Sequence, residues 1–264
     1  MNTATDISQY PSYEVPLDYS AEEWQARVEL AACYRLAHHY GWTTLVYNHI
    51  TARIPGTEDL LINPFGLMYD EITASNLVKI DIEGNKLCNS PHPVNKAGYV
   101  IHSAVHQARP DFQCSLHTHS EQAEALACVS TGFIPMTQTG CMFYERVGYH
   151  DFQGIALDEA ERKSLITDLG KTNHTLVLKN HGVLVCAPNI PWAISRMYSF
   201  EMACRSQLKA MASGAPLNKL SHEVMSHTRD QFESGDSAAG ADVLLPEWPA
   251  WLRMLDRQDP GWRT

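Results

Sequence analysis

The stretch SLHTHSEQAE, residues 115–124, places His117 and His119 one residue apart, between an apolar run and a segment with helical spacing. Side chains two residues apart on a strand point to the same face of a sheet, so the two imidazoles would lie side by side. This geometry suits two ligands of one metal ion, although such a pair alone is more often structural. A metal site therefore requires a third ligand from elsewhere in the chain.

The stretch LVLKNHGVLV, residues 176–185, offers that ligand. His181 lies at a tight turn between two apolar runs and is followed by Gly182, so its side chain can project from the edge of a sheet. Three neutral imidazoles with an open coordination position are typical of a catalytic metal site. Nitrogen ligands do not choose among zinc, manganese, iron and cobalt. We therefore predict one divalent ion per chain, bound by His117, His119 and His181.

The composition limits the class of protein. The chain has 264 residues, of which 44% are apolar and 19% charged, as in ordinary globular proteins. Thirty acidic and twenty basic side chains give a formal net charge of −10. This charge would repel a phosphate backbone or an anionic bilayer, so nucleic acid and membrane are not expected as partners.

The chain is expected to reside in the cytoplasm. Its sequence has no apolar run of membrane-spanning length, and its first residues, MNTATDISQYPSYEVP, lack the basic start and apolar middle of a signal peptide. The seven cysteines are scattered and form no C-x-x-C pair, so they are interpreted as reduced thiols rather than disulfides or zinc ligands.

Strands and helices are predicted to alternate along the chain. Strands are expected at 49–54, 59–64, 76–85, 112–119, 175–180 and 182–187, with hairpins formed by the first two and the last two. Helices are expected at 21–41, 96–111, 120–130, 158–170 and 190–213. This order, without internal repeats, favours one α/β domain with a mixed sheet and helices on both faces.

The ends of the chain differ from this pattern. Residues 1–18 are expected to form an N-terminal arm and residues 19–215 the domain. Residues 216–264 are expected to form a C-terminal tail. Its tryptophans indicate that the tail covers apolar surface, either on the domain or on a neighbouring subunit; they are Trp248, Trp251 and Trp262.

Other histidines are less informative. His92 and His150 lie in segments predicted to be irregular, from which a side chain could reach a cleft. His102 and His106 share a face of the helix predicted at 96–111, and they are interpreted as packing residues.

Taken in order, several motifs resemble the class II aldolase/adducin family. They are LVYNHITARIPG (45–56), LLINPFGLMYDEIT (60–73), LVKIDIEGN (77–85), HSAVHQARPDFQCSLHTHS (102–120) and TLVLKNHGVLV (175–185). The resemblance covers about residues 25 to 210. It implies a single three-layer α/β/α domain around a mixed, largely antiparallel sheet. It also implies a homotetramer with small-molecule sites near subunit interfaces, and a divalent ion on the three histidines named above.

The chain departs from the aldolases of that family at two places. Those enzymes carry a catalytic glutamate in a Ser-Ser-Glu context before the histidine pair, whereas this chain has KAG, with Gly98 at the glutamate position. Asn48 and Gly66 match the aldolase phosphate loop, but Asn63 begins an NPFG turn that replaces a threonine-rich one. Sugar-phosphate aldol cleavage is therefore disfavoured. We keep Asn48, Asn63, Gly66 and His92 as candidate substrate-binding residues.

A divalent ion on three histidines can still act as a Lewis acid toward a hydroxy- or oxo-carboxylate and stabilise the enolate left when a carbon–carbon bond breaks. Decarboxylation needs no base to begin, so we predict a metal-dependent lyase of the decarboxylase type. Tyr144 and His150 are the candidate proton donors. The alternatives are aldolase-type cleavage of a small hydroxy-carbonyl compound, a non-haem iron oxygenase, and a non-catalytic adducin-like binding domain.

Overall fold

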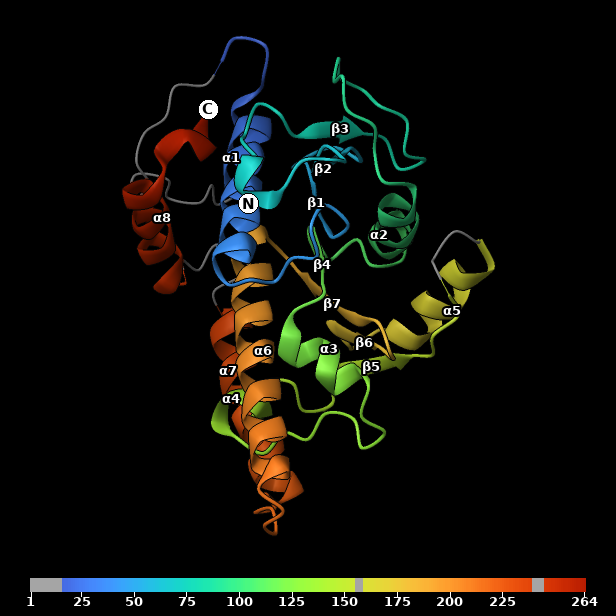
Figure 1. Cartoon of the computed structure of the whole chain (residues 1–264), viewed down its shortest axis with the longest axis vertical. Helices are drawn as coiled ribbons and strands as arrows, with labels where there is room; N and C mark the ends of the chain where they lie inside the picture. The colour runs from blue at the N-terminus through green and yellow to red at the C-terminus, as the bar shows by residue number, and fades with distance from the viewer. Residues whose placement is uncertain (1–15, 155–158, 239–244) are drawn as a thin grey trace.

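The computed structural model describes residues 16–154, 159–238 and 245–264. They form a seven-stranded sheet between two layers of helices (Figure 1). The strands are β1 (His49–Arg53), β2 (Leu60–Ile62), β3 (Val78–Ile80), β4 (Cys114–Thr118), β5 (Val147–His150), β6 (Thr175–Leu178) and β7 (Gly182–Ala187). The N-terminal arm predicted for residues 1–18 lies almost wholly outside the described residues.

The sheet is mixed and largely antiparallel, as predicted. Its strand order is β3-β2-β1-β4-β7-β6-β5. Strands β5 and β6 are parallel, and the other pairings in the described part of the chain are antiparallel. The hairpins β1–β2 and β6–β7 confirm the two hairpins predicted from the sequence. Strand β4, which carries His117, lies in the middle of the order.

Helices cover both faces of the sheet, which confirms the three-layer α/β/α class. The helices are α1 (Ala21–His39), α2 (Lys96–Ala108), α3 (Glu121–Ala127), α4 (Gln138–Cys141), α5 (Glu159–Leu169), α6 (Ile190–Ala212), α7 (His222–Ala238) and α8 (Glu247–Gln258), with short 3₁₀ turns at Tyr69–Glu71 and Pro260–Arg263. One apolar core joins α1, α3, α6 and α8 to the sheet. A second core joins α2 and α5 to its other face. Burial of these two faces is the main driving force for the fold.

The first helix begins where the sequence predicts. The Ser20 hydroxyl accepts a hydrogen bond of 3.1 Å from the Glu23 backbone N–H, which caps α1. At α6, Pro191 occupies the first turn and the Asn189 side chain accepts from the Trp192 backbone N–H at 2.9 Å.

Strand β5 was missed in the sequence, where its residues were interpreted as irregular. It has four residues and contains Gly148, so its apolar pattern is too short to recognise. It forms through parallel pairing with β6, in which His150 lies opposite Leu178. His150 therefore belongs to an edge strand of the sheet and not to a loop.

The C-terminal residues, predicted only as a tail, contain the two helices α7 and α8. Helix α8 packs on α1 and α6, and Trp248 and Trp262 are fully buried there. The division of the chain at residues 18 and 215 stays a prediction. Among the described residues, no helix has the length and apolar character that a membrane crossing requires.

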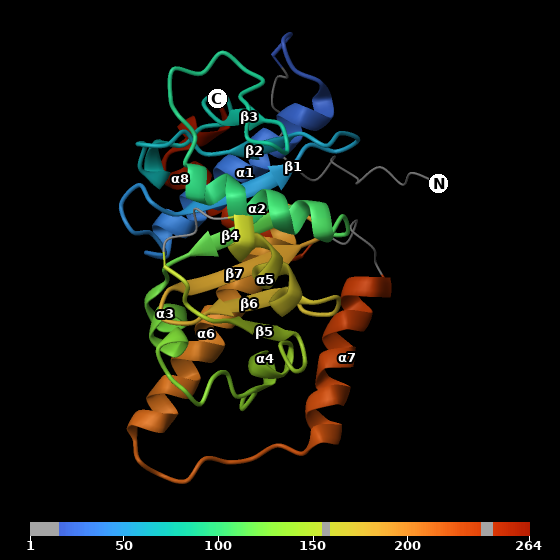
Figure 2. The ribbon, with the colours of Figure 1, turned by 90° about the vertical axis from the view of Figure 1, so that its right-hand side faces the viewer.

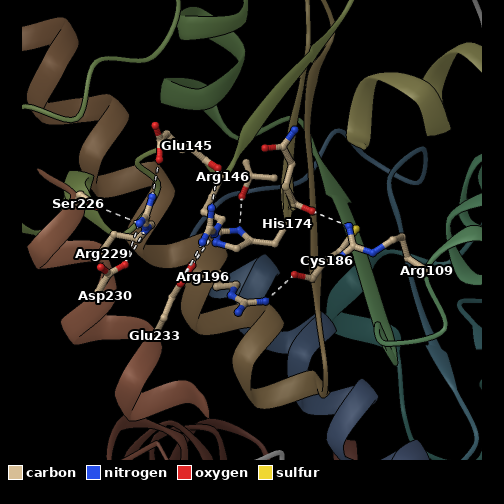
Figure 3. A network of polar contacts seen from close by, with 12 residues as sticks. Arg109, Glu145, Arg146, His174, Cys186, Arg196, Ser226, Arg229, Asp230 and Glu233 are labelled. Atoms are coloured by element: carbon tan, nitrogen blue, oxygen red, sulfur yellow. Dashed lines mark hydrogen bonds and ion pairs between the residues drawn. The ribbon is translucent and has the colours of Figure 1, made fainter. Parts of the chain in front are cut away.

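Helix α7 is attached mainly by polar contacts. Figure 2 shows it running beside the sheet, after the loop that follows α6. None of residues 222–234 is fully buried. Arg146 donates to the Glu233 carboxylate at 3.0 Å and Arg229 donates to Glu145 at 2.6 Å, so the segment before β5 holds the helix (Figure 3).

Candidate metal centre

Three neighbouring strands, β1, β4 and β7, have one end each on the same side of the sheet, where the strands run into loops. Strand β4 ends with Thr118, next to the point where its antiparallel neighbours β1 and β7 begin. His117 and His119 come from the end of β4, and His181 comes from the turn that leads into β7. In this turn Asn180 has a φ of 58°, a left-handed conformation that asparagine tolerates. The sheet therefore brings together three histidines that are distant in the sequence.

The three imidazoles have the geometry of a common ligand set. The Nε2 atoms of His117 and His119 are 3.2 Å apart. The potential ligand atoms of these two residues and His181 all lie within 4.8 Å of one another. Nitrogens bound tetrahedrally to one zinc ion would be about 3.3 Å apart, given bonds of about 2.0–2.1 Å. The donor set therefore fits a divalent ion with only small side-chain adjustments.

Hydrogen bonding and burial prepare these rings for a cation. The Nδ1 of His117 donates to the Val183 carbonyl at 2.9 Å, which leaves Nε2 to act as a ligand. Burial lowers the pKa of His117 and of His119, and it lowers the pKa of His181 to about 4. All three rings are therefore neutral at pH 7, the form that binds a metal.

Gly182 permits this close arrangement. A Cβ atom at this position would lie 2.8 Å from the Thr118 carbonyl oxygen and 3.1 Å from Cδ2 of His119. Both distances are shorter than ordinary contacts, so a larger residue would separate β7 from the end of β4. The glycine that follows His181 is thus explained by close packing against the histidine pair.

His49 is a fourth histidine of this region, and its sequence context does not distinguish it as a site residue. The register of β1 and β4 places His49 directly opposite His117, so both rings lie on the same face of the sheet. Their ring centroids are 5.1 Å apart. His49 is 3% exposed, and burial lowers its pKa to about 3, an effect that the Tyr47 backbone partly opposes. No local sequence pattern indicates that His49 lies beside His117, because this position depends on the pairing of two strands that are distant in the sequence.

Gly98 provides the space for the His49 ring. A Cβ on Gly98 would lie 2.8 Å from Cγ of His49. Behind His49, the His102 ring lies with its centroid 4.5 Å away, and its Nδ1 is 2.8 Å from the Thr51 hydroxyl. His106 is also bonded to Thr51, at 2.9 Å. The two histidines of α2, His102 and His106, were expected to be packing residues. They pack next to His49 and Thr51, on the side of the His49 ring away from His117.

The candidate substrate-binding residues gather around the start of β1. The Asn48 side-chain oxygen accepts from the Thr44 backbone N–H at 2.6 Å, and its buried Nδ2 has no hydrogen-bond partner in the described part of the chain. Asn63 is buried, and its side-chain oxygen accepts from the Tyr34 hydroxyl at 2.9 Å. Gly66 takes a φ of 103° in the turn that follows, a conformation suited to glycine.

A connection links that turn to the segment containing His92. The Phe65 backbone N–H donates to the Pro93 carbonyl at 3.0 Å. His92 lies in the loop before α2 and is partly exposed; its backbone carbonyl accepts from the Lys86 ammonium and its backbone N–H donates to the Ser90 hydroxyl. Among the described residues, no contact joins the His92 imidazole to the triad.

The two candidate proton donors lie in different places. The Nδ1 of His150 is 2.8 Å from a carboxylate oxygen of Asp168 in α5. His150 and His181 line the same small pocket, together with Phe152. Tyr144 instead faces α7, where its hydroxyl is 2.6 Å from Nδ1 of His222. Within one chain the structure brings His150, and not Tyr144, toward the triad.

Comparison with known proteins agrees with this fold. The model of the Class II Aldolase and Adducin N-terminal domain matches residues 28–208. A Pseudomonas aeruginosa protein named for the class 2 aldolases is 44% identical over 98% of this chain and 99% of its own length. Alpha-adducin of Rattus norvegicus is 35% identical over 93% of this chain but only 35% of its own length.

Solved structures give the same result. An aldolase II superfamily protein from Pseudomonas syringae superposes with a TM-score of 0.85 at 40% identity, covering 94% of this chain and 98% of that chain. The L-fuculose 1-phosphate aldolase of Glaciozyma antarctica superposes with a TM-score of 0.80 at 26% identity, covering 97% and 98%. The resemblance noted in the sequence is thereby confirmed. The chain belongs to the class II aldolase and adducin family.

Proposed function

We propose that the chain is a divalent-metal-dependent carbon–carbon lyase whose ion is bound by His117, His119 and His181. The convergence of three neutral imidazoles carries this proposal, because three histidine ligands are typical of a catalytic metal site, in which a further coordination position is left to water or substrate. A bound ion would supply Lewis acidity, which polarises a substrate oxygen. The residues that hold it do not decide among zinc, manganese, iron and cobalt.

Within this class we propose decarboxylation of a hydroxy- or oxo-carboxylate. The observation that favours it lies at Gly98, which has no side chain that could act as a base, while the His49 ring fills the space that a Cβ at this position would enter. In decarboxylation the bond to the carboxylate carbon breaks, its electron pair stays on the remaining carbon, and carbon dioxide leaves. No base is needed to start this step.

The remaining carbon must then take a proton, and His150 is the proposed donor. Asp168 holds its Nδ1, so the ring is oriented and proton exchange with substrate would use Nε2. The pocket that His150 shares with His181 supports this assignment. Tyr144 would take part only if the oligomer brings it to the site of a neighbouring chain.

For substrate binding we propose the buried Asn48 amide, whose Nδ2 can donate to a substrate oxygen, with Asn63, Gly66 and His92 shaping the adjoining loops. The substrate is then a small molecule. A homotetramer with sites near the subunit interfaces, and a cytoplasmic location, are also part of this proposal.

Two other functions each have a specific observation in their favour. The likeness to L-fuculose 1-phosphate aldolase, over 97% of this chain, favours aldol cleavage. The identity with alpha-adducin favours a binding domain without catalysis. The histidine triad argues against the second alternative, because a scaffold has no need of three converging imidazoles.

The test is turnover by protein loaded separately with zinc, manganese, iron or cobalt. We expect carbon dioxide release from at least one member of a panel of hydroxy- and oxo-carboxylates, and none from a His117→Ala variant. Turnover of fuculose or rhamnulose phosphate in place of this release would establish aldol cleavage. Oxygen consumption by the iron form would establish an oxygenase. A loaded protein with none of these activities would contradict the lyase proposal.

A further inference from the structure

We propose that His49 is an oxyanion-binding residue of the site. Its ring N–H would donate to the substrate oxygen on which negative charge develops when the carbon–carbon bond breaks. This inference rests on the proposed lyase function. It names the group that stabilises the negatively charged oxygen, a role that neither the triad nor His150 has been given.

The position of His49 supports this role. Its ring lies between those of His102 and His117, with centroid distances of 4.5 and 5.1 Å. The pairing of β1 with β4 fixes its Cα opposite that of His117. A ring held on both sides in this way keeps its orientation without a ligand, which is the property that charge-stabilising donors require.

The hydrogen-bonding state of His49 points to a missing acceptor. A neutral imidazole has one donor and one acceptor nitrogen. Both nitrogens of His49 are buried, and neither has a hydrogen bond of full geometry among the described residues, although the Tyr47 backbone lies close enough to raise the pKa of the ring slightly. A buried donor without a partner is costly, so a native site of this kind is expected to be completed by a ligand or by water.

The surroundings favour an oxygen anion over a cation or an apolar group. Asn48, which precedes His49 in the sequence, has a second buried donor, Nδ2, without a partner in the described residues. Gly98, which touches the His49 ring, lies in the first turn of α2. That turn carries no acidic residue and no side-chain cap, so its backbone N–H groups favour negative charge nearby.

Gly98 is then a positioning residue for the same group. An added Cβ would approach Cγ of His49 to 2.8 Å, and the ring cannot retreat toward His102, whose Nδ1 is bonded to Thr51. A side chain at position 98 would therefore turn the His49 ring away from its present orientation. The two residues should behave as a coupled pair.

The first experiment measures oxalate binding by calorimetry to the metal-loaded protein. Oxalate presents two adjacent oxygens and a negative charge, as the enolate of a 2-oxo acid does. We expect His49→Phe to weaken oxalate binding about 10-fold or more while the metal content stays that of the parent. His49→Asn, which keeps a donor N–H, should recover part of the affinity. His38→Phe, at an exposed position on α1, is the matched control and should bind as the parent does.

The outcomes separate the two proposals. If the loaded parent binds oxalate and His49→Phe binds it equally well, the role of His49 is refuted and the lyase proposal stands. If the loaded parent does not bind oxalate, the oxyanion site is refuted, and the lyase proposal is decided separately by the turnover assay.

A second experiment needs neither metal nor substrate. Gly98→Ala should lower the urea midpoint of the metal-free protein, and the same substitution in a His49→Ala background should have little effect, because the clashing ring is gone. An equal loss in both backgrounds would show that the Gly98 and His49 contact does not exist, and would overturn the proposed orientation of the ring.

Discussion

Gly182→Ala is expected to damage the metal centre without removing a ligand. The new Cβ would lie 2.8 Å from the Thr118 carbonyl oxygen, whereas an ordinary carbon–oxygen contact is about 3.3 Å or longer. The overlap is therefore about half an ångström. The carbonyl belongs to the backbone at the end of β4, where Thr118 pairs with Val183, so it cannot move as a flexible side chain would.

Two measurable consequences follow from this overlap. Forcing an extra methyl group into packed backbone costs about 1–3 kcal/mol, so the metal-free variant should unfold at lower urea. The same Cβ would lie 3.1 Å from Cδ2 of His119, so relief of the clash displaces either this ring or the adjacent His181. Disturbing the support of a metal ligand typically weakens binding about 10- to 100-fold.

The assay is competition for the ion against a chelator of known affinity, combined with urea unfolding of the metal-free protein. Gly140→Ala in α4 is a matched control, since its Cβ would meet the Thr137 hydroxyl at 3.1 Å and lies outside the metal centre. It should retain the parent's ion affinity. A Gly182→Ala protein with the stability and ion affinity of the parent would refute the close-packing explanation.

Three further predictions concern the histidines. His117→Ala should reduce the bound ion from close to one per chain to near zero by elemental analysis, and full occupancy would refute the ligand assignment. His150→Gln should lower kcat about 100-fold or more, and Asp168→Asn should lower it less, both with unchanged metal content; equal rates in all three proteins would exclude this donor. The metal-free fold should lose stability in acid, because burial lowers the pKa of both His49 and His106 to about 3 while the unfolded chain titrates near 6.5. Stability is then complete above about pH 7 and falls as the pH drops through 6.5, by about 2 kcal/mol for each ring at pH 5; urea midpoints that do not change between pH 7.5 and 5 would contradict this.

Most of the sheet could be predicted because its signals are local. The runs at β1, β2, β6 and β7 are apolar and β-branched, and each hairpin closes over a short turn. Strand β5 could not be predicted, since four residues containing Gly148 have no periodicity that distinguishes a strand from a loop. Helix α7 could not be predicted either. None of residues 222–234 is fully buried, so the helix has no buried face that would require apolar residues at helical spacing.

The residues of the candidate site also divide into those that local sequence patterns predict and those that they do not. The sequence predicts His117 and His119 because two residues at this spacing on one strand share a face, and it predicts His181 because its turn is explicit in the sequence. His49 was not found, because its neighbour across the sheet is set by the register of β1 with β4, which neither strand reveals alone. Residues whose roles depend on long-range pairing are thus the part of a site that sequence patterns omit.

The close approach of Gly98 and His49 limits which residues can occur together at positions 98 and 49 on this sheet. A side chain at position 98 and an imidazole at position 49 compete for a single volume, since even a Cβ at 98 approaches the ring to 2.8 Å. A single change of Gly98 to glutamate would therefore not seat a carboxylate beside the triad. Replacing the proposed His49 donor by a carboxylate base at position 98 would therefore require both positions to change together, while the histidine triad stays where β4 and β7 place it.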